Sequence, residues 1–323
     1  MNLQYFRISI KEKFSILKAI VYKSTGSWYS VKTEDGTPYN ARIKGALKIE
    51  GIKSTNPVAV GDLVDVEDGD LENNVMITNI YDRHNYITRV SPHNKNQHHI
   101  IASNLDQCVL VATLREPKTS MGFVDRFLIT AEAYHIPAII VFNKADVYRK
   151  KEIELFEHFK DIYESVGYKV ILTSTVSGQG VDEVKDLLKE KITLISGHSG
   201  VGKSSFINII FPEKNLKTKE VSGWSGKGMH TTTFAEMFDL PFGGKIIDTP
   251  GIRELGLVDI SKQELSHYYP EMRNTLQDCQ FNNCLHVEEP GCAIKAAVES
   301  GKIYADRYVS YLNILGTIEE NYK

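Results

Sequence analysis

The sequence has no long hydrophobic run, and no stretch approaches the roughly 20 apolar residues that a membrane-spanning helix needs. Its first residues include acidic and basic side chains where a secretory signal would have an apolar core. A large charge of either sign is also absent: the formal net charge is -3, so binding of nucleic acid would depend on local basic patches. We therefore expect a cytoplasmic protein with no membrane partner.

Cysteine is scarce as well, with four in the chain, and three of them lie close together near the C-terminus. The pattern C-x4-C-x-H-x5-C is formed by Cys279, Cys284, His286 and Cys292. Three thiolates and one imidazole are the donor set of a closed, tetrahedral structural zinc site, whereas a disulfide would be typical of a secreted protein. We predict one zinc ion per chain, and a core position for Cys108, which lies in an apolar segment.

The length and composition indicate several ordinary globular domains. A chain of 323 residues is long for one core, and 42% hydrophobic with 24% charged residues excludes general disorder. Residues 1–14 have no clear period, and we assign them no function.

Short alternating strands separated by turns fill residues 15–90. The strand patterns are "KAIVYKSTGSWYSVKT", "PYNARIKG", "VGDLVDVED" and "VMITNIYD", with turn residues at Asp35-Gly36 and Gly61-Asp62. This spacing predicts a small β-barrel of the OB type. Such a barrel either offers a face for nucleic acid or only packs against its neighbour, because a fold alone does not decide function.

A different pattern follows the polar linker at residues 91–99. Continuous apolar runs, "DQCVLVAT" and "AIIVFNKAD", enclose the helical period of "VDRFLITAEAY", and "KVILTS" and "ITLISG" come later. Strands that alternate with helices predict a doubly wound α/β domain with a mainly parallel sheet, which binds ligands at the carboxyl ends of its strands.

The stretch "ISGHSGVGKSSFIN" fits the phosphate-binding P-loop, G-x-x-x-x-G-K-[ST]. Its glycines let backbone N–H groups form an anion nest at a helix N-terminus. Lys203 would reach the β- and γ-phosphates, and the Ser204 hydroxyl would ligate Mg²⁺. The predicted nucleotide-binding residues of this loop are Gly197, His198, Ser199, Gly200, Val201, Gly202, Lys203, Ser204 and Ser205.

The tetrapeptide "NKAD" follows a predicted buried strand of the same sheet. The Asp146 carboxylate can accept two N–H groups of guanine, the Asn143 amide can meet the major-groove edge, and the stem of Lys144 can lie against the base. Adenine lacks that donor pair, so GTP is preferred over ATP, although a plain surface turn is the alternative. Ser174 and Thr175 in "TSTVSGQG" can offer backbone donors to the base carbonyl.

Two further stretches have the residues of nucleotide switches. In "KIIDTPG", Asp248 can hold Mg²⁺ through water and the N–H of Gly251 can meet the γ-phosphate. In "GKGMHTTTF", one of three threonines, for which we choose Thr232, can ligate Mg²⁺ in the triphosphate state. An ordinary flexible loop is the alternative for this second stretch.

The base motif precedes the P-loop, so the guanine-nucleotide set is circularly permuted. "DTPG" becomes nearly the last element of its domain, and a shift that depends on the γ-phosphate would pass directly into the following segment. The predicted parts are a leader (1–14), an OB-type β-barrel (15–90), a circularly permuted P-loop GTPase domain (91–258) and a mainly helical zinc-binding module (259–323).

In this joint order the motifs resemble those of the RsgA (YjeQ) family, circularly permuted GTPases that act in maturation of the small ribosomal subunit. The resemblance covers about residues 15–323. It implies an OB-fold domain, contact with the 30S subunit and 16S rRNA, hydrolysis of GTP to GDP and phosphate that 30S stimulates, and a late role in 30S assembly. We expect a monomer that uses Mg²⁺ with GTP.

The resemblance also bears on catalysis. Many GTPases place a glutamine after the DxxG glycine to orient water, whereas this chain has Ile252, a hydrophobic replacement that the family shares. His230 matches the histidine that is proposed in this family to position the water instead. Its alternative role is to order the loop. Met229 stands where the family pattern usually has arginine.

Two other classes of function remain open. One is a GTP-dependent switch that acts on a protein partner without RNA. The other is a nucleotide-sensing RNA-binding protein with negligible hydrolysis.

Overall fold

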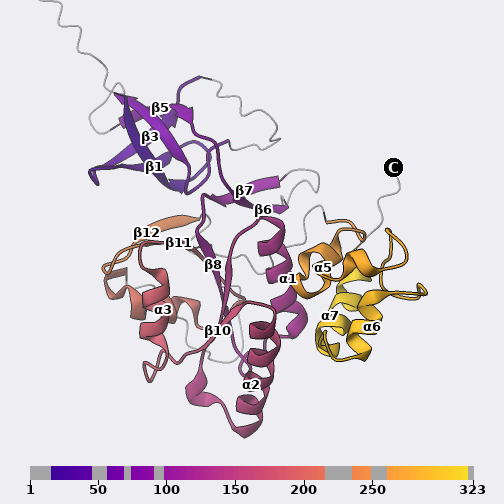
Figure 1. Cartoon of the computed structure of the whole chain (residues 1–323). Helices are drawn as coiled ribbons and strands as arrows, with labels where there is room; N and C mark the ends of the chain where they lie inside the picture. Colours follow the sequence, from indigo (N-terminus) through magenta and orange to yellow (C-terminus); the bar gives the residue numbers. More distant parts are fainter. Residues whose placement is uncertain are drawn as a thin grey trace, which may run out of the picture.

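The computed structural model describes residues 16–45, 57–68, 74–90, 98–214, 235–248 and 260–318. Figure 1 shows three parts in chain order: a β-barrel, an α/β domain and a helical C-terminal module, so the predicted multidomain fold is confirmed. In these ranges no helix is both long enough and apolar enough to cross a membrane.

The barrel closes because its first strand pairs with both the second and the fourth. The strands run in the order β1-β2-β3-β5-β4, and only the β3–β5 pair is parallel. Alternate residues face the interior, where Val21, Val31 and Val64 are fully buried. The five strands are β1 (Leu17–Ser24), β2 (Tyr29–Thr33), β3 (Pro38–Ile43), β4 (Leu63–Asp68) and β5 (Asn74–Ile80).

The α/β domain is built on a sheet with the order β10-β9-β8-β11-β13-β12, parallel except at β12. Every residue of β8 is buried because helices cover both faces. Helices α1 and α2 pack on one face, and α3 and α4 on the other. The strands are β8 (Gln107–Ala112), β9 (Ala138–Phe142), β10 (Lys169–Leu172), β11 (Ile192–Ser196), β12 (Glu236–Asp239) and β13 (Lys245–Asp248); the helices are α1 (Met121–Ala133), α2 (Lys150–Ser165), α3 (Val181–Leu188) and α4 (Lys203–Ile210). Short 3-10 turns, η1 (Ala145–Val147) and η2 (Pro212–Lys214), follow β9 and α4.

A two-stranded antiparallel sheet, β6 (Tyr86–Val90) and β7 (His98–Ser103), lies between the barrel and the α/β domain (Figure 1). The stretch predicted as a linker therefore ends in a strand, since β7 begins at His98. A fully buried carboxylate, Asp62, fixes the barrel to this sheet. It accepts bonds from Arg83 Nε and Ser103 Oγ, both at 2.6 Å.

A second joint connects the barrel to β12. Strands β1 and β12 pair at one residue couple, Lys23 and Glu236, so eleven strands form one continuous sheet. The Asp239 carboxylate accepts from Tyr22 (2.6 Å), Lys32 (2.5 Å) and Lys245 (2.8 Å). Burial alone would raise the pKa of Asp239, but these three partners lower it to about 2.

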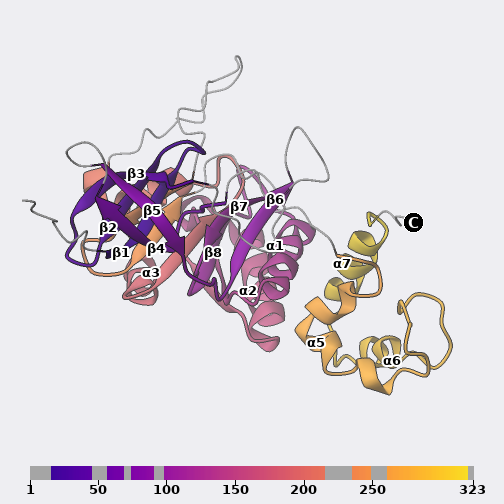
Figure 2. The same cartoon turned by 90° about the horizontal axis from the view of Figure 1, so that it is seen from above.

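The C-terminal module packs on the outer side of α1 (Figure 2), and Ile129 of α1 belongs to its apolar core. Beneath this contact the buried guanidinium of Arg307 donates to Asp125 of α1 and to Glu271 Oε1, the latter at 2.7 Å. It also lies 4.5 Å from the ring centroid of Tyr269. The elements of the module are η3 (Leu265–Tyr268), α5 (Pro270–Arg273), η4 (Leu276–Asp278), α6 (Ala293–Glu299) and α7 (Ala305–Leu315).

Candidate nucleotide and metal sites

The predicted nucleotide-binding segments meet at one edge of the α/β sheet. Strands β8, β9, β10 and β11 are parallel, so their carboxyl ends lie together. The P-loop follows β11, the NKAD segment follows β9, and the segment with Ser174 and Thr175 follows β10. This edge is where open α/β sheets bind ligands.

The P-loop glycines have backbone conformations that other residues rarely adopt. The φ angles of Gly197, Gly200 and Gly202 are +144°, +86° and +91°. A Cβ on Gly197 would lie 2.3 Å from the carbonyl oxygen of Val111, and one on Gly202 would lie 2.5 Å from Asn143 Nδ2. Only glycine fits at these positions, and the loop leads directly into α4. The arrangement is suited to binding an anion.

Lys203 and Asp248 provide opposite charges beside this loop. Lys203 Nζ donates to the carbonyl oxygen of Gly197 at 3.0 Å. Burial lowers the pKa of Lys203, and the negative charge of Asp248 acts in the opposite direction. Asp248 pairs in register with Ile195 of β11, and Ser204 lies half-buried in the first turn of α4. A cation and a Mg²⁺-type oxygen ligand are thus adjacent to the anion-binding loop.

At the other end of the site a serine joins the two loops that the sequence predicts to bind the base. Ser174 Oγ donates to Asp146 Oδ1 at 2.5 Å and accepts the N–H groups of Val176 and Ser177 at 3.2 and 3.1 Å. Asp146 is exposed, and Thr175 beside Ser174 is half-buried. The Asp146 carboxylate is therefore oriented by Ser174 although the residue is exposed.

Asn143 is completely buried and joins the base motif to the P-loop. Its Nδ2 donates to the carbonyl oxygen of Val201 at 3.0 Å, and its Oδ1 accepts from Thr173 Oγ1 at 3.3 Å. One N–H of the Asn143 amide is engaged in this way, so the role of Asn143 in base recognition stays a prediction. Lys144 has a φ of +69° and donates from Nζ to the carbonyl oxygen of Glu116 at 2.5 Å, while burial lowers the pKa of Lys144.

The sequence reasoning missed the loop of residues 113–120, which connects β8 to α1 and lies against the P-loop. A Cβ on Gly200 would be 3.3 Å from Pro117 Cδ, and Thr119 Oγ1 is 2.8 Å from His198 Nε2. The position of this loop in the sequence could have revealed it. A segment that follows β8 must lie at the same sheet edge as the P-loop, which follows the parallel strand β11. Other predicted residues, His230, Thr232, Gly251 and the replacements Met229 and Ile252, lie outside the described residues.

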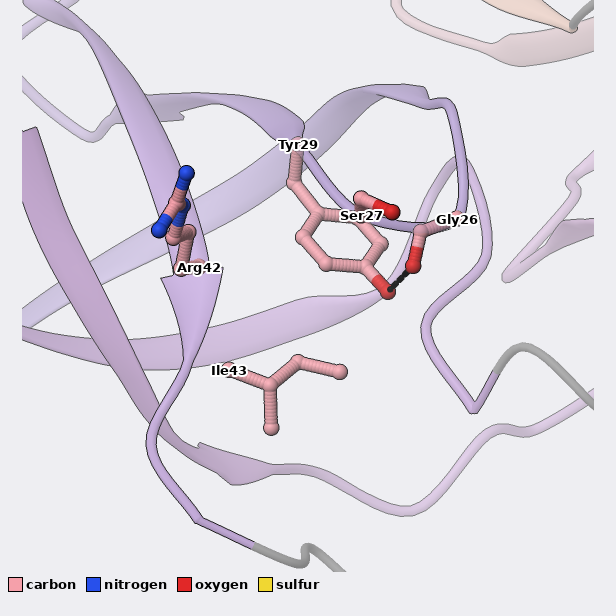
Figure 3. Close-up of a pocket in the computed structure, with 5 residues that line it drawn as sticks. All are labelled: Gly26, Ser27, Tyr29, Arg42 and Ile43. Atoms are coloured by element: carbon pink, nitrogen blue, oxygen red, sulfur yellow. Dashed lines mark hydrogen bonds between the residues drawn. The ribbon is translucent and has the colours of Figure 1, made fainter.

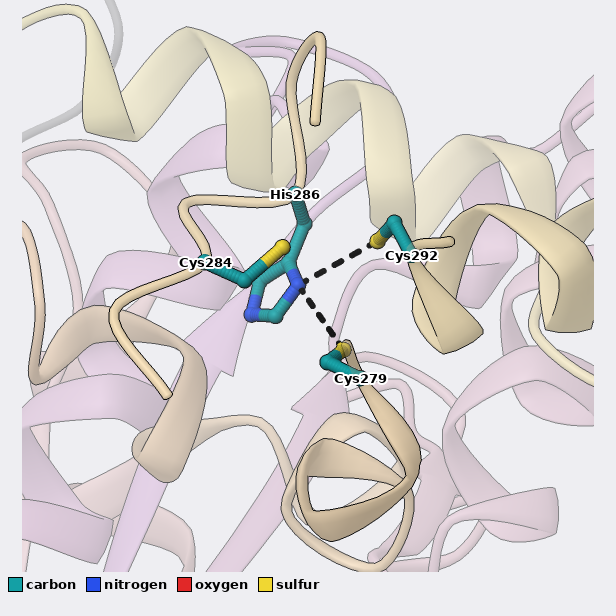
Figure 4. Close-up of side chains that lie close together, drawn as sticks. All are labelled: Cys279, Cys284, His286 and Cys292. Atoms are coloured by element: carbon teal, nitrogen blue, oxygen red, sulfur yellow. Dashed lines mark hydrogen bonds between the residues drawn. The ribbon is translucent and has the colours of Figure 1, made fainter. Parts of the chain in front are cut away.

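The four predicted metal ligands converge in the C-terminal module (Figure 4). The ligand atoms of Cys279, Cys284, His286 and Cys292 all lie within 4.8 Å of one another. His286 Nδ1 is 3.4 Å from Cys292 Sγ and 3.7 Å from Cys279 Sγ. Burial raises the pKa of Cys284 to about 12, so a thiolate there needs a positive partner. The donor set fits a metal ion, and this cluster is a candidate metal site.

The barrel has a surface pocket of about 400 Å³ between the β1–β2 turn and the end of β3 (Figure 3). Its lining residues are Gly26, Ser27, Tyr29, Arg42 and Ile43. The Arg42 guanidinium lies 3.8 Å from the ring centroid of Trp28, which is 40% exposed. A cation stacked on an exposed aromatic ring is a surface on which a nucleobase can stack.

Two family models match the chain: the RsgA N-terminal domain over residues 18–76 and the RsgA GTPase over residues 80–258. Similar curated proteins are named "Small ribosomal subunit biogenesis GTPase RsgA". That of Christiangramia forsetii is 52% identical over 95% of this chain and 98% of its own. That of Cytophaga hutchinsonii is 54% identical over 93% of this chain and 98% of its own.

Solved structures have the same architecture. The crystal structure of YjeQ from Thermotoga maritima has a TM-score of 0.77 and 33% identity, covering 94% of this chain and 98% of its own. The crystal structure of YloQ, described as a circularly permuted GTPase, has a TM-score of 0.73 and 28% identity, covering 95% of this chain and 98% of its own. The similarity therefore includes the barrel, the α/β domain and the C-terminal module together.

Proposed function

This chain belongs to the RsgA family and is a ribosome-biogenesis GTPase, and from that premise we propose that it binds the 30S subunit and assists its late maturation. It hydrolyses GTP to GDP and phosphate, and the 30S subunit stimulates this reaction. The observation that carries the proposal is the meeting of a P-loop, an oriented Asp146 and Asp248 at one sheet edge, in a chain that matches the family over nearly its whole length.

Each residue of the site has a defined task in this proposal. The backbone N–H groups of the glycine-rich loop hold the phosphates, and Lys203 exchanges its bond with Gly197 for the β- and γ-phosphates. Asp146 accepts two N–H groups of guanine. Ser204, Asp248 and Thr232 would hold Mg²⁺, which neutralises the charge that develops on the phosphates when it is bound. His230 positions the attacking water, because Ile252 has no polar atom with which to do so.

The barrel contacts 16S rRNA. The pocket beside Trp28 and Arg42 supports this assignment, since OB folds bind nucleic acid at strands 2 and 3 and at the first loop. A net charge of -3 restricts RNA contact to such local surfaces.

The metal cluster holds one structural Zn²⁺ per chain. The three sulfurs and one imidazole support zinc over magnesium or calcium, which prefer oxygen ligands. The protein is further proposed to act as a cytoplasmic monomer.

Turnover of GTP by the full chain, measured alone and with 30S or 50S subunits, tests this proposal. We expect 30S subunits to stimulate hydrolysis and 50S subunits to have no effect. Binding to 30S should also weaken steeply with added salt, because phosphate contacts release counterions. The alternative, a switch that acts on a protein partner without RNA, predicts no stimulation by 30S.

A further inference from the structure

The P-loop contains a histidine, His198, whose imidazole makes three contacts that a P-loop does not require. Its Nε2 lies 2.8 Å from Thr119 Oγ1, and its Nδ1 lies 3.2 Å from the carbonyl oxygen of Ser199. The ring packs edge to face on Phe123 of α1, with centroids 5.2 Å apart and an interplanar angle of 87°. The ring is thus held on three sides.

These contacts select one tautomer of the neutral imidazole. A carbonyl oxygen only accepts, so Nδ1 must carry the proton and donate to Ser199. Nε2 then accepts from the Thr119 hydroxyl, whose oxygen in turn accepts the N–H of Thr113 at 3.0 Å. A continuous chain of hydrogen bonds therefore runs from Thr113 through Thr119 and His198 to the P-loop backbone. Both ring nitrogens are engaged, so the imidazole is not available to deprotonate water.

The Ser199 carbonyl and the Gly200 N–H belong to the same peptide unit. In a planar trans peptide these two groups point in opposite directions, so holding the carbonyl toward the imidazole directs the N–H of Gly200 away from it. Gly200 is exposed and has a φ of +86°, and because glycine adopts positive and negative φ about equally, its own backbone does not fix the orientation of this peptide plane. The imidazole supplies the restraint that the glycine lacks.

We propose that His198 is a positioning residue that holds the Ser199–Gly200 peptide so that the Gly200 N–H points to the nucleotide phosphates. Thr119 fixes the tautomer that makes this bond possible. The inference rests on the proposed binding of a guanine nucleotide. It adds a side chain, His198, to the backbone groups that prepare the loop for phosphate binding.

Two substitutions of His198 separate its hydrogen bonds from its bulk. His198→Phe keeps a ring against Phe123 but has no N–H, whereas His198→Gln keeps an amide donor and an acceptor. We expect His198→Phe to weaken GDP binding at least about tenfold, the scale for losing a hydrogen bond to a charged group. His198→Gln should stay within about threefold of wild type. His158→Phe makes the same chemical change on α2 and should leave GDP affinity unchanged.

Guanosine provides the readout that distinguishes positioning from general damage, because it has the base and no phosphate. Its competition for the site should change by less than about twofold in His198→Phe. Equal GDP affinity of wild type and His198→Phe would overturn the proposal, and so would an equal loss for guanosine and GDP. A wild-type protein that binds neither GDP nor GTP would instead overturn the proposed function.

Thr119→Val tests the same chain of bonds without touching the P-loop. We expect it to weaken GDP binding about threefold or more, with Thr119→Ser restoring the wild-type value because it restores the hydroxyl. If Thr119→Val binds GDP as wild type does, Thr119 does not select the tautomer.

Discussion

At the scale of single residues, the nucleotide site depends on side chains that hold other groups in place. Ser174 is hydrogen-bonded to the Asp146 carboxylate and to two backbone N–H groups of its own loop. Asn143 connects the base motif to the P-loop from a fully buried position. Ser174 and Asn143 therefore hold the described loops of the site in place without a ligand.

Asp146 gives the first prediction. Asp146→Asn turns one acceptor into a donor opposite the N–H groups of guanine, which should cost about 1–3 kcal/mol and lower GTP affinity about tenfold or more. Equilibrium binding of GTP, with ATP as the comparison, measures the change. An Asp146→Asn protein that binds GTP as tightly as wild type would contradict the role of this carboxylate.

The motif residues could be predicted from the sequence because phosphate binding and metal binding require particular residue types at fixed spacing. That is how Gly197, Gly202 and the Cys279 to Cys292 cluster were found. Thr119 could not be found in this way, because it lies 79 residues before His198 in the chain and meets it only through the sheet topology. Asp62 was predicted only as a turn residue, and its buried partners come from two later segments.

At the scale of elements, α1 serves two neighbours. Its Phe123 contacts the P-loop histidine, and Asp125 and Ile129 contact the C-terminal module. The helical period of this segment predicted the helix but not its partners. Its polar partner Arg307 and its apolar partners lie in parts of the chain that follow much later.

Arg307 should be critical for the docking of α7 on α1. Arg307→Met leaves the carboxylates of Asp125 and Glu271 without their shared cation, and losing one partner of a buried ion pair costs about 3–5 kcal/mol. Arg273→Met is the matched control, since its pair with Glu132 is half exposed and should contribute about 0–1 kcal/mol. Urea unfolding compares them, and equal losses in both variants would argue against the network.

The metal cluster should stabilise the module to which it belongs. Cys284→Ser removes one of the four proposed ligands. We therefore expect less bound zinc than the one ion per chain proposed for wild type, and a less stable C-terminal module. Elemental analysis measures the metal, and protease resistance of the module measures its stability. GDP binding is the control and should be retained. Wild-type protein free of zinc after careful preparation would refute the assignment.

At the scale of the whole molecule, the sheet order shows what the circular permutation preserves. Strand β11, which precedes the P-loop, lies between β8 and β13, although it comes after β8, β9 and β10 in the chain. The motif order predicted the circular permutation, because a nucleotide pocket depends on where its parts lie in space and not on their order in the chain. The strand order itself was not predicted. The contacts between barrel and α/β domain could not be predicted, since they join residues about two hundred positions apart, such as Tyr22 and Asp239.

Stimulation by the 30S ribosomal subunit is a prediction for the whole molecule. We expect 30S, but not 50S, to raise GTP turnover at least about tenfold, which corresponds to roughly 1.4 kcal/mol of barrier. His230→Ala should abolish most of this gain and leave GTP affinity within a few fold, because the imidazole would act on water and not on bound nucleotide. Equal stimulation of wild type and His230→Ala would remove the histidine from catalysis.

Among the described residues, hydrogen bonds attach the barrel around Asp62 beside β7 and around Asp239 beside β12, with one residue pair of strand contact between β1 and β12. A line through these two attachments defines an axis. Rotation of the barrel about this axis disturbs the bonds at Asp62 and Asp239 less than a translation of the barrel does. We therefore expect the barrel to pivot about this axis relative to the α/β domain. Such a pivot would carry the surface of Trp28 and Arg42 along an arc while the nucleotide pocket stays still.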